Sequence, residues 1–320
     1  MEKALLIGID GGATHSTAVA AWNDGAVAAV AYGGGLNFNN IGTEAVRGHL
    51  ESMVRELCEK AGADAACVCA GMAALDAPAD ETTTRKFTGL LSEKQLDLQS
   101  DAYVALMGLT QGNPGMIAIC GTGSMLLLAD NSGNQHISGG WGYLMEDSGS
   151  GYAIAREGLL AAIDEYEGTG SDTPLTARAH EFFGAPDLRK AIDFLYGPDF
   201  SPDKLAAFAR HVLTEADNGD PISVGIIQKN MRKLARQAAM LFKKAPEAKH
   251  IGLYGGIFAH SALARNEFSD ALRADVPDCV ICAPEFRPEL GAIIHLMKKR
   301  GELTRDTLEN LKNTYERISQ

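Results

Sequence analysis

Two short glycine-rich turns carry the residues best suited to binding an anion. The first reads "DGGATHS" over residues 10–16 and the second reads "GTGS" over residues 121–124. Glycine lets backbone N–H groups crowd an anion, and Thr14, Thr122 and Ser124 can add hydroxyl donors. A glycine-rich hairpin turn can also serve conformation alone. Because the same turn occurs twice, we predict that both bind phosphate, through Gly11, Gly12 and Thr14 in the first and Gly121, Thr122 and Gly123 in the second.

Asp10 ends a buried strand directly before the first turn. A carboxylate there would repel a phosphate unless a cation lay between them, and Mg²⁺ takes one or two carboxylates together with phosphate oxygens and water. The alternative is an aspartate that accepts N–H groups of its own turn. We predict a magnesium site at Asp10, with the ion held through water. Near the matching point of the second turn stands Cys120, which can simply pack.

Asp101 follows the expected strand "LDLQS" where a helix begins. Ligands of open α/β sheets gather at the carboxyl ends of strands. Phosphoryl transfer to a hydroxyl needs a group that accepts the proton and aims the oxygen, and an aspartate is ionised at neutral pH. The alternative is a helix N-cap. The spacing alone leaves both interpretations open.

Three further stretches combine polar, aromatic and glycine residues in patterns typical of ligand sites. "NFNNIGT" at 37–43 is rich in asparagine, which suits sugar hydroxyls and amides but also plain turns. "GGWGYLMEDSGSGY" at 139–152 flanks a tryptophan with glycines, which a core tryptophan rarely needs. "LYGGIFAH" at 253–260 places two glycines between a strand and a helix. Adenine or ribose could lie against that backbone, or the glycines could form a tight turn.

The helices and strands expected around these residues follow one order that occurs twice in the chain. The turn sequence "GNPG", residues 112–115, separates the two copies. Each copy reads strand, strand, strand, helix, strand, helix, strand, helix. Such alternation predicts mixed sheets with helices on their faces and a ligand cleft between two lobes. The expected boundaries are 1–115 for the first lobe and 116–302 for the second, with a helical insertion at about 150–244 and a C-terminal helix at about 303–320 that packs back on the first lobe.

Composition and charge indicate a globular protein and argue against a nucleic-acid-binding or disulfide-rich one. The chain has 320 residues, 46% of them apolar, so it can bury a sizeable core. Its net charge of −12 argues against nucleic acid as a partner. The 6 cysteines show no disulfide framework, and we read Cys279 and Cys282 as part of a buried strand rather than a metal site. With no signal peptide or membrane span recognisable, we expect a cytoplasmic protein.

The motifs occur in the order found in sugar kinases of the actin/hexokinase/Hsp70 superfamily. The segments are "IGIDGGATHS", "QSDAYVAL", "ICGTGSM", "GGWGYLMEDSGSGYAIAREGL", "LYGGIFAH" and "RPELGAI". The chain resembles most the N-acetylglucosamine kinases within the BadF/BadG/BcrA/BcrD ATPase family, over nearly its whole length. The resemblance implies an α/β fold of two duplicated actin-like, ribonuclease H-like ATPase lobes.

The resemblance also implies roles for single residues. Asp101 matches the catalytic base, and Gly255 and Gly256 match the adenosine pocket, which residues 288–292 help to wall. Two positions depart from the family pattern: Ala13 replaces a common glycine, where a positive φ would be strained, and Glu146 stands where glycine is frequent. The residues that match the sugar site are Asn37, Asp101, Ser124, Gly140, Trp141 and Asp147.

From this resemblance we expect an enzyme that uses ATP and Mg²⁺ to phosphorylate an amino sugar at its 6-hydroxyl. The expected substrate is N-acetylglucosamine, with glucosamine and N-acetylmuramic acid as alternatives, and the expected assembly is a homodimer. A second hypothesis is an ATPase that activates a partner redox enzyme, but the cysteines form no cluster-like run. A third is a sugar-sensing repressor, for which the charge is wrong and no DNA-binding extension precedes residue 4.

Overall fold

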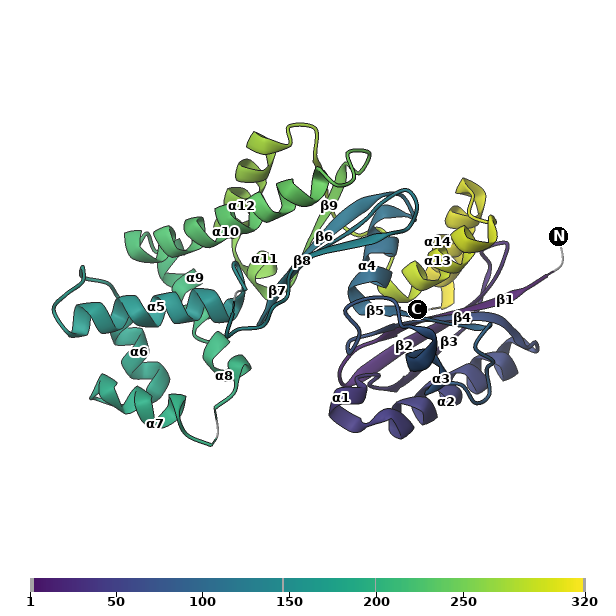
Figure 1. Cartoon of the computed structure of the whole chain (residues 1–320), viewed down its shortest axis with the longest axis horizontal. Coiled ribbons are helices and arrows are strands. Elements are labelled where there is room, and N and C mark those ends of the chain that lie inside the picture. Colours follow the sequence, from purple (N-terminus) through teal and green to yellow (C-terminus); the bar gives the residue numbers. More distant parts are fainter. Residues whose placement is uncertain (1–2, 146, 199, 319–320) are drawn as a thin grey trace. The chain divides into compact units, whose positions relative to one another are not determined.

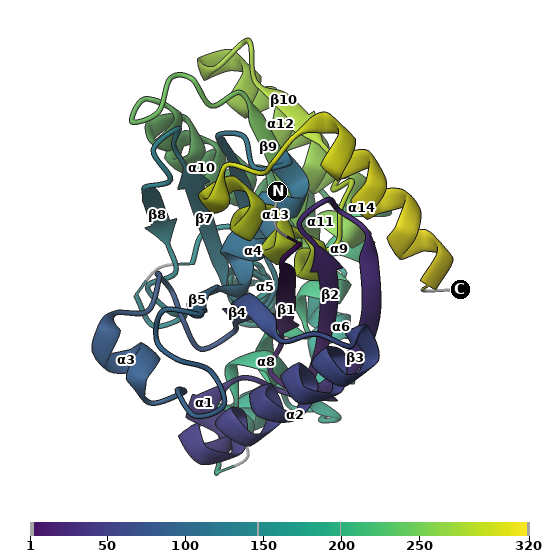
Figure 2. The same ribbon diagram turned by 90° about the vertical axis from the view of Figure 1, so that its right-hand side faces the viewer.

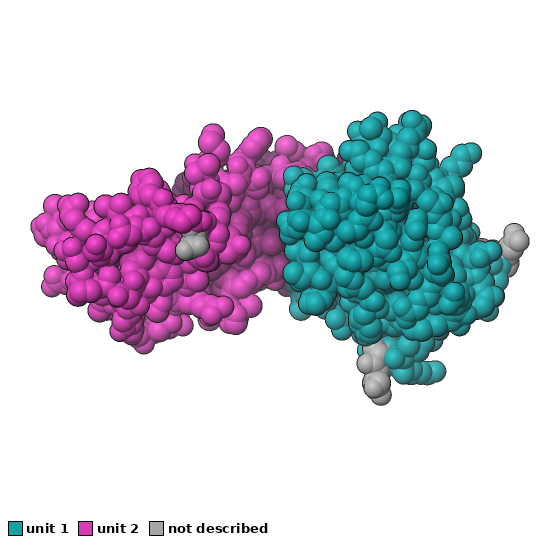
Figure 3. Space-filling model, turned by 90° about the horizontal axis from the view of Figure 1, so that it is seen from below, with its two compact units in different colours: residues 1–115, 282–320 teal, residues 116–281 magenta. Residues whose placement is uncertain are grey.

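The computed structural model describes residues 3–145, 147–198 and 200–318, and the chain divides into two compact units (Figure 3). Unit 1 contains residues 1–115 together with 282–320, and unit 2 contains residues 116–281. In the described part of the chain, every helix is too short or too polar to cross a membrane.

Unit 1 is built on a five-stranded sheet in the order β3-β2-β1-β4-β5 (Figure 1). The first three strands are antiparallel neighbours, whereas β4 runs parallel to β1 and β5 runs parallel to β4. The strands are β1 (Leu5–Gly11), β2 (His15–Trp22), β3 (Val27–Gly34), β4 (Ala65–Met72) and β5 (Leu96–Ser100). The helices are α1 (Phe38–Ile41), α2 (Thr43–Ala61), α3 (Glu81–Arg85), α4 (Asp101–Thr110), α13 (Pro288–Arg300) and α14 (Arg305–Ile318).

Helices cover both faces of this sheet (Figure 2). The central strand β1 is therefore apolar on both faces, as expected of a strand buried between layers. Its odd-numbered side chains, such as Ile7, join the core under α2, and Leu6 joins the core under α13 and α14. Helix α2 buries a stripe of apolar residues at helical spacing: Val46, Leu50, Met53, Val54 and Leu57.

Unit 2 repeats this topology. Its sheet has the order β10-β9-β6-β7-β8, so that β6, β7, β8, β9 and β10 take the places of β1 to β5. The predicted duplication of a mixed α/β lobe is thus confirmed. The strands are β6 (Gly115–Cys120), β7 (Ser124–Ala129), β8 (Gln135–Gly139), β9 (His250–Tyr254) and β10 (Val280–Cys282).

Most helices of unit 2 lie in the long segment between β8 and β9. The longest, α10 (Pro221–Phe242), begins with Asp220 as N-cap, which accepts from the Ser223 N–H at 2.9 Å, and has a proline in its first turn, where proline is favoured. The others are α5 (Gly151–Tyr166), α6 (Leu175–Phe183), the 3-10 helix η1 (Leu188–Lys190), α7 (Ala191–Leu195), α8 (Pro202–Ala206), α9 (Ala209–Asp217), α11 (Gly256–His260) and α12 (Ala262–Asp275).

The structure differs from the expected domain boundary at α13. Residues 282–302 were expected in the second lobe, but they belong to unit 1. The reason is close backbone packing: a Cβ on Gly8 of β1 would lie 2.3 Å from the Glu289 carbonyl oxygen, and one on Gly291 would lie 1.9 Å from that of Val104 in α4. The C-terminal helix α14 also packs in unit 1, where Leu311 and Tyr315 are buried.

Candidate active site

Unit 1 brings Asp10 and Asp101 to the same end of its sheet. Asp10 is paired in register with Gly71 of the parallel strand β4, and β5 ends at Ser100, directly before Asp101. Gly71 makes this possible, because a Cβ there would lie 2.4 Å from the Val104 side chain and 3.2 Å from the Asp101 Cα. The glycine lets the first turn of α4 approach the strand that neighbours Asp10.

Both carboxyl groups are partly buried, and burial raises the pKa of each. The pKa of Asp10 rises to about 6, chiefly through burial and further through the negative charges of Glu289 and Asp101, while the Arg287 guanidinium opposes the rise. Burial also raises the pKa of Asp101, against the hydrogen bond from the Ala102 N–H. A bound cation would favour the ionised form of such a pair. Carboxylate oxygens that repel one another, as those of Asp10 and Asp101 do, are ligands that suit a hard divalent cation.

Asp101 is not the N-cap of α4, so that alternative is wrong. Ser100 caps the helix, and its Oγ accepts from the Tyr103 N–H at 3.1 Å. Asp101 is the first helical residue, and its Oδ1 accepts from the Ala102 N–H at 2.7 Å. Since the neighbouring serine performs the capping, the helix start does not explain the carboxylate at position 101.

The first glycine-rich turn is tied to its surroundings through its backbone. A Cβ on Gly11 would lie 2.5 Å from the Gly71 carbonyl oxygen, so close packing alone already requires glycine there. The Gly12 N–H donates to the His15 carbonyl at 3.1 Å, and Thr14 is exposed. Ala13 does not have a positive φ, so its methyl group causes no backbone strain. Phosphate binding by this turn stays a prediction.

Asn37 caps the short helix α1, because its Oδ1 accepts from the Asn39 N–H at 3.0 Å. The cap uses the side-chain oxygen and leaves the amide NH₂ group as the donor for a ligand. Its predicted contact with sugar can therefore use the donating amide NH₂ group without breaking the cap.

The second glycine-rich turn is fixed on the start of α5. The carbonyl oxygens of Gly121 and Thr122 accept from Gly151 and Tyr152 at 2.7 and 3.1 Å. The Thr122 hydroxyl donates to Asp203 Oδ1 at 2.6 Å.

Ser124, the last residue of this turn, is buried. Its hydroxyl donates to the Ser148 carbonyl at 2.8 Å, so only its oxygen lone pairs remain for the predicted contact with sugar.

Residues on both sides of Glu146 contact this turn, because the Gly140 N–H donates to the Ser124 carbonyl at 2.9 Å and the Ser148 carbonyl accepts from the Ser124 hydroxyl. Gly140 and Gly142 have φ of 72° and 85°, which explains the glycines around Trp141. Trp141 is 77% exposed and therefore not a core residue. Asp147 is buried, and a Cβ on Gly123 would lie 3.1 Å from its Oδ2. Glu146 lies outside the described residues.

A cavity of about 280 Å³ in unit 2 unites several predicted nucleotide ligands. Gly121, Thr122 and Gly256 all line it. Sequence reasoning missed further lining residues, namely Asp203 of α8, Arg210 of α9 and His260 of α11. The histidine stands inside a quoted motif, but the other two lie in the helical insertion, where no motif marks them.

Close packing accounts for the glycine at position 255 and the cysteine at position 120. Gly255 has a φ of 94°, and a Cβ there would lie 2.2 Å from the Cys120 carbonyl oxygen. Cys120 is fully buried in the core of unit 2, where burial raises the pKa of its thiol. Residues 288–292, expected to help wall the adenosine pocket, pack on β1 in unit 1, whereas Gly255 and Gly256 are in unit 2.

Comparison with known proteins identifies the family of the chain. A model of the BadF/BadG/BcrA/BcrD ATPase family matches residues 7–295. An N-acetylmuramic acid/N-acetylglucosamine kinase of Clostridium acetobutylicum is 26% identical over 296 residues, which cover 90% of this chain and 97% of that protein. An N-acetyl-D-glucosamine kinase of Dictyostelium discoideum is 28% identical over 312 residues, with 92% and 98% covered.

A solved structure shows the same fold. It is a ROK family glucokinase from Streptomyces griseus in complex with glucose and AMPPNP, with a TM-score of 0.54, 16% identity, and 92% of this chain and 100% of that chain covered. The expected actin-like fold and the expected enzyme class, a kinase, are confirmed, and the family match supports the use of ATP. With its match spanning residues 7–295, the chain belongs to the BadF/BadG/BcrA/BcrD ATPase family.

Proposed function

We propose that the protein transfers the γ-phosphoryl group of ATP to the 6-hydroxyl of an amino sugar, with N-acetylglucosamine as the expected substrate. The observation that carries the proposal is the pair of partly buried carboxylates, Asp10 and Asp101, at the same end of the sheet of unit 1, where Asp10 lies near the end of β1 and Asp101 follows β5. The curated amino-sugar kinases, whose matches cover at least 90% of either chain, support the substrate class. Glucosamine and N-acetylmuramic acid are the alternative acceptors.

Asp101 is the general base in this proposal. Its carboxylate accepts the proton of the sugar hydroxyl as the oxygen bonds to the γ-phosphorus and the bond to the leaving ADP breaks. A base works best when its pKa lies near the working pH, and burial moves the pKa of Asp101 in that direction. The fold thus tunes the group as well as placing it.

Asp10 would hold Mg²⁺ through water. The ion would neutralise charge on the triphosphate. The partly buried Asp10 carboxylate would be the residue that holds the ion in place.

The remaining predicted residues divide between the two units. In unit 1, the first turn binds phosphate and Asn37 donates to the sugar. In unit 2, Gly121, Thr122, Gly123, Gly255 and Gly256 bind the nucleotide, and Ser124, Gly140, Trp141 and Asp147 bind the sugar. A homodimer in the cytoplasm is part of the same proposal.

A coupled assay of ADP release tests the function. We expect turnover with at least one of N-acetylglucosamine, glucosamine and N-acetylmuramic acid, and far less with glucose. Asp101→Asn should lower kcat by about 10²–10⁴-fold, the usual contribution of a general base, while titration calorimetry shows ATP binding unchanged.

Asp24→Asn, which changes an exposed turn aspartate in the same unit, is the matched control and should keep full activity. Silence with all four sugars would refute the proposed function. Near-normal turnover of Asp101→Asn would refute the assignment of the base alone.

A further inference from the structure

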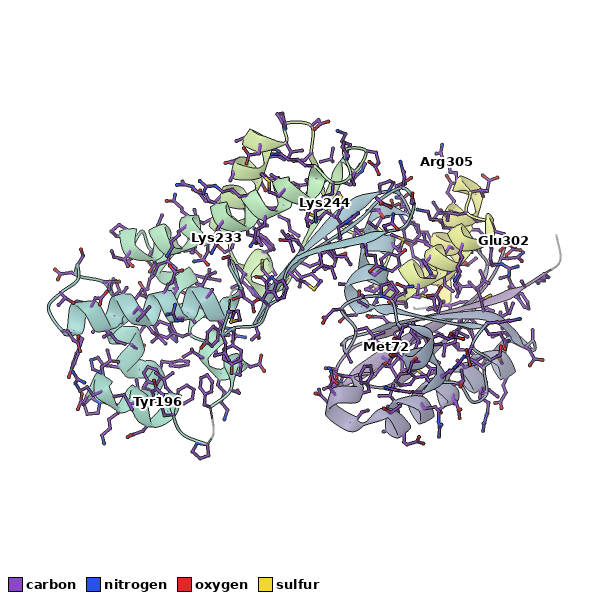
Figure 4. All side chains as sticks on the ribbon, viewed as in Figure 1. Met72, Tyr196, Lys233, Lys244, Glu302 and Arg305 are labelled. Carbon is purple, nitrogen blue, oxygen red and sulfur yellow. The ribbon has the colours of Figure 1, made fainter. Side chains whose placement is uncertain are left out.

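A second cavity of unit 2, of about 350 Å³, lies beside the loop that carries Asp147. Its walls come from that loop, from the first turns of α5 and from the middle of α10, where Lys233 is labelled in Figure 4. The volume is in the range of small-molecule sites, about 300–1,000 Å³. The lining is polar and charged, and it includes Tyr143, Asp147, Tyr152, Arg156, Asn230 and Lys233.

The walls of this cavity are held in place by buried contacts. Asn230 is 4% exposed, and its Oδ1 accepts from the Gly149 N–H at 3.0 Å, which ties α10 to the loop. The rings of Tyr143 and Tyr152 pack with centroids 4.9 Å apart, which ties the same loop to α5. The cavity is therefore a built site whose shape does not depend on surface side chains alone.

Among the described residues, the walls hold a cation, Arg156, that forms no ion pair. Glu157 is already engaged, because its Oε2 accepts from Lys229 at 2.9 Å and its Oε1 accepts from Asn230 at 3.2 Å. Within the described residues, Arg156 makes neither an ion pair nor a side-chain hydrogen bond. Its positive charge acts on the Tyr152 hydroxyl, where it opposes the rise of the pKa that burial causes. The guanidinium thus lies in the cavity wall with no carboxylate paired to it in the described part of the chain.

A guanidinium offers a planar pair of donors that matches a carboxylate, and such charge-assisted bonds are among the strongest polar contacts. Asp147, in the same cavity, is proposed above to take sugar hydroxyls. The anion that fits Arg156 would therefore belong to the sugar itself. N-acetylmuramic acid is N-acetylglucosamine with a lactic acid group in ether linkage, and one curated relative acts on both sugars.

We propose that Arg156, assisted by Lys233, binds the lactyl carboxylate of N-acetylmuramic acid, so that the protein phosphorylates this sugar as well as N-acetylglucosamine. The inference rests on the amino-sugar kinase activity proposed above. The lactyl carboxylate is bound and not consumed. The phosphoryl group is transferred to the 6-hydroxyl oxygen and the hydroxyl proton to Asp101, as in the reaction proposed above. Arg156 is thus a residue of specificity and takes no part in the transfer.

The test compares three acceptors: N-acetylmuramic acid, its methyl ester and N-acetylglucosamine. Arg156→Gln should lower kcat/KM for the free acid about tenfold or more, the typical effect of losing a hydrogen bond to a charged group. The same variant should change kcat/KM for the ester and for N-acetylglucosamine less than about twofold, because neither carries the charge. Arg156→Lys should restore part of the preference.

Arg232→Gln is the matched control. Arg232 stands beside Lys233 on α10, pairs with Glu267 at 3.2 Å and does not line the cavity. Its loss removes the same charge and should leave the ratio between the two sugars unchanged. Added salt should weaken turnover of N-acetylmuramic acid more than that of N-acetylglucosamine.

Several results would overturn the inference. If N-acetylglucosamine is phosphorylated but the free acid is no better than its ester, Arg156 does not bind the carboxylate and only the proposed function survives. If Arg156→Gln lowers turnover of both sugars equally, the residue has no role in specificity. If no sugar is phosphorylated, calorimetry still decides, because wild type must bind the acid more tightly than the ester and Arg156→Gln must not.

Discussion

At the scale of single residues, Asp10 shows a conflict between folding and the proposed chemistry. Folding partly buries this carboxyl among Glu289 and Asp101, whose charges add to the cost of ionising it. A magnesium site needs the ionised form. The protein without ligands therefore carries an unfavourable charge that a bound cation would relieve.

This conflict predicts how Asp10→Asn changes stability with pH. The pKa of Asp10 is raised from 3.8 to about 6 in the folded protein, so folding favours the protonated form. That contribution to stability is fully present below about pH 3.8 and is lost as the pH rises through about 6. Without ligands, Asp10→Asn should therefore be more stable than wild type at pH 8, by up to about 3 kcal/mol, and nearly equal to it near pH 4.

Urea unfolding at the two pH values measures this difference. Activity should fall strongly in the same variant. An Asp10→Asn protein that unfolds more easily than wild type at pH 8 would show that the carboxylate is stabilised by partners and would contradict the assignment.

Sequence reasoning at this scale identified residue types better than residue roles. The aspartates at positions 10 and 101 were found from strand ends, which local pattern reveals. The hydrogen bond that the Ser124 hydroxyl donates was not found, because its acceptor Ser148 is distant in sequence. Nor was it found that Glu157 is engaged by the distant Lys229, while Arg156 makes no ion pair within the described residues.

At the scale of elements, both units use glycine to bring the ends of neighbouring strands together. Gly11 of β1 lies against the backbone of β4 at Gly71, near Met72 at the end of that strand (Figure 4). In unit 2, Gly255 after β9 lies against the backbone of β6 at Cys120. The same contact between equivalent strands shows that the duplication extends to packing and is more than a shared order of elements.

This packing predicts opposite effects of two glycine substitutions in unit 2. Gly255→Ala should lower the free energy of unfolding by about 2 kcal/mol or more, because it adds strain at positive φ and a clash with the backbone of Cys120. Gly121→Ala should leave stability nearly unchanged, since no atom lies within 4 Å of the new methyl group. It should still weaken ATP binding, because the methyl group would enter the nucleotide cavity.

Thermal unfolding and calorimetric titration with ATP separate the two effects. Gly225→Ala in α10 serves as the control, with open space around the new methyl group and an expected gain of about 0.5–1 kcal/mol. A Gly121→Ala protein that binds ATP normally would argue that this turn is conformational only.

At the scale of the whole chain, unit 1 is assembled from both ends of the sequence. The chain passes from unit 1 into unit 2 at residue 116 and returns at residue 282. The returning helices complete the core of unit 1, and Tyr315 of α14 donates to Glu289 Oε1 at 2.6 Å. Glu289 is 1% exposed, so this bond from the C-terminal helix satisfies a buried carboxylate close to Asp10.

Tyr315→Phe should therefore destabilise the protein by about 1–3 kcal/mol, the cost of leaving a buried acceptor without its donor. The comparison is Tyr166→Phe, which removes a hydroxyl bonded to Asp187 at 3.1 Å on an exposed surface and should change stability by less than about 0.5 kcal/mol. Urea unfolding measures both. If both substitutions changed stability by the same small amount, the ion pair of Glu289 with Arg287 at 3.2 Å would be sufficient to stabilise the buried carboxylate without Tyr315.

What the sequence determined by itself is the order of elements, their duplication and the aspartates and glycines at strand ends. These features follow from local hydrophobic periods and turn residues, which act over a few positions. The tertiary structure alone decided that α13 joins unit 1, that Gly71 lets α4 approach the strand beside Asp10, and that Lys229 binds Glu157 while Arg156, within the described residues, has no ion-pair partner. Each of these depends on contacts between distant segments, and only close packing of the folded chain specifies such contacts.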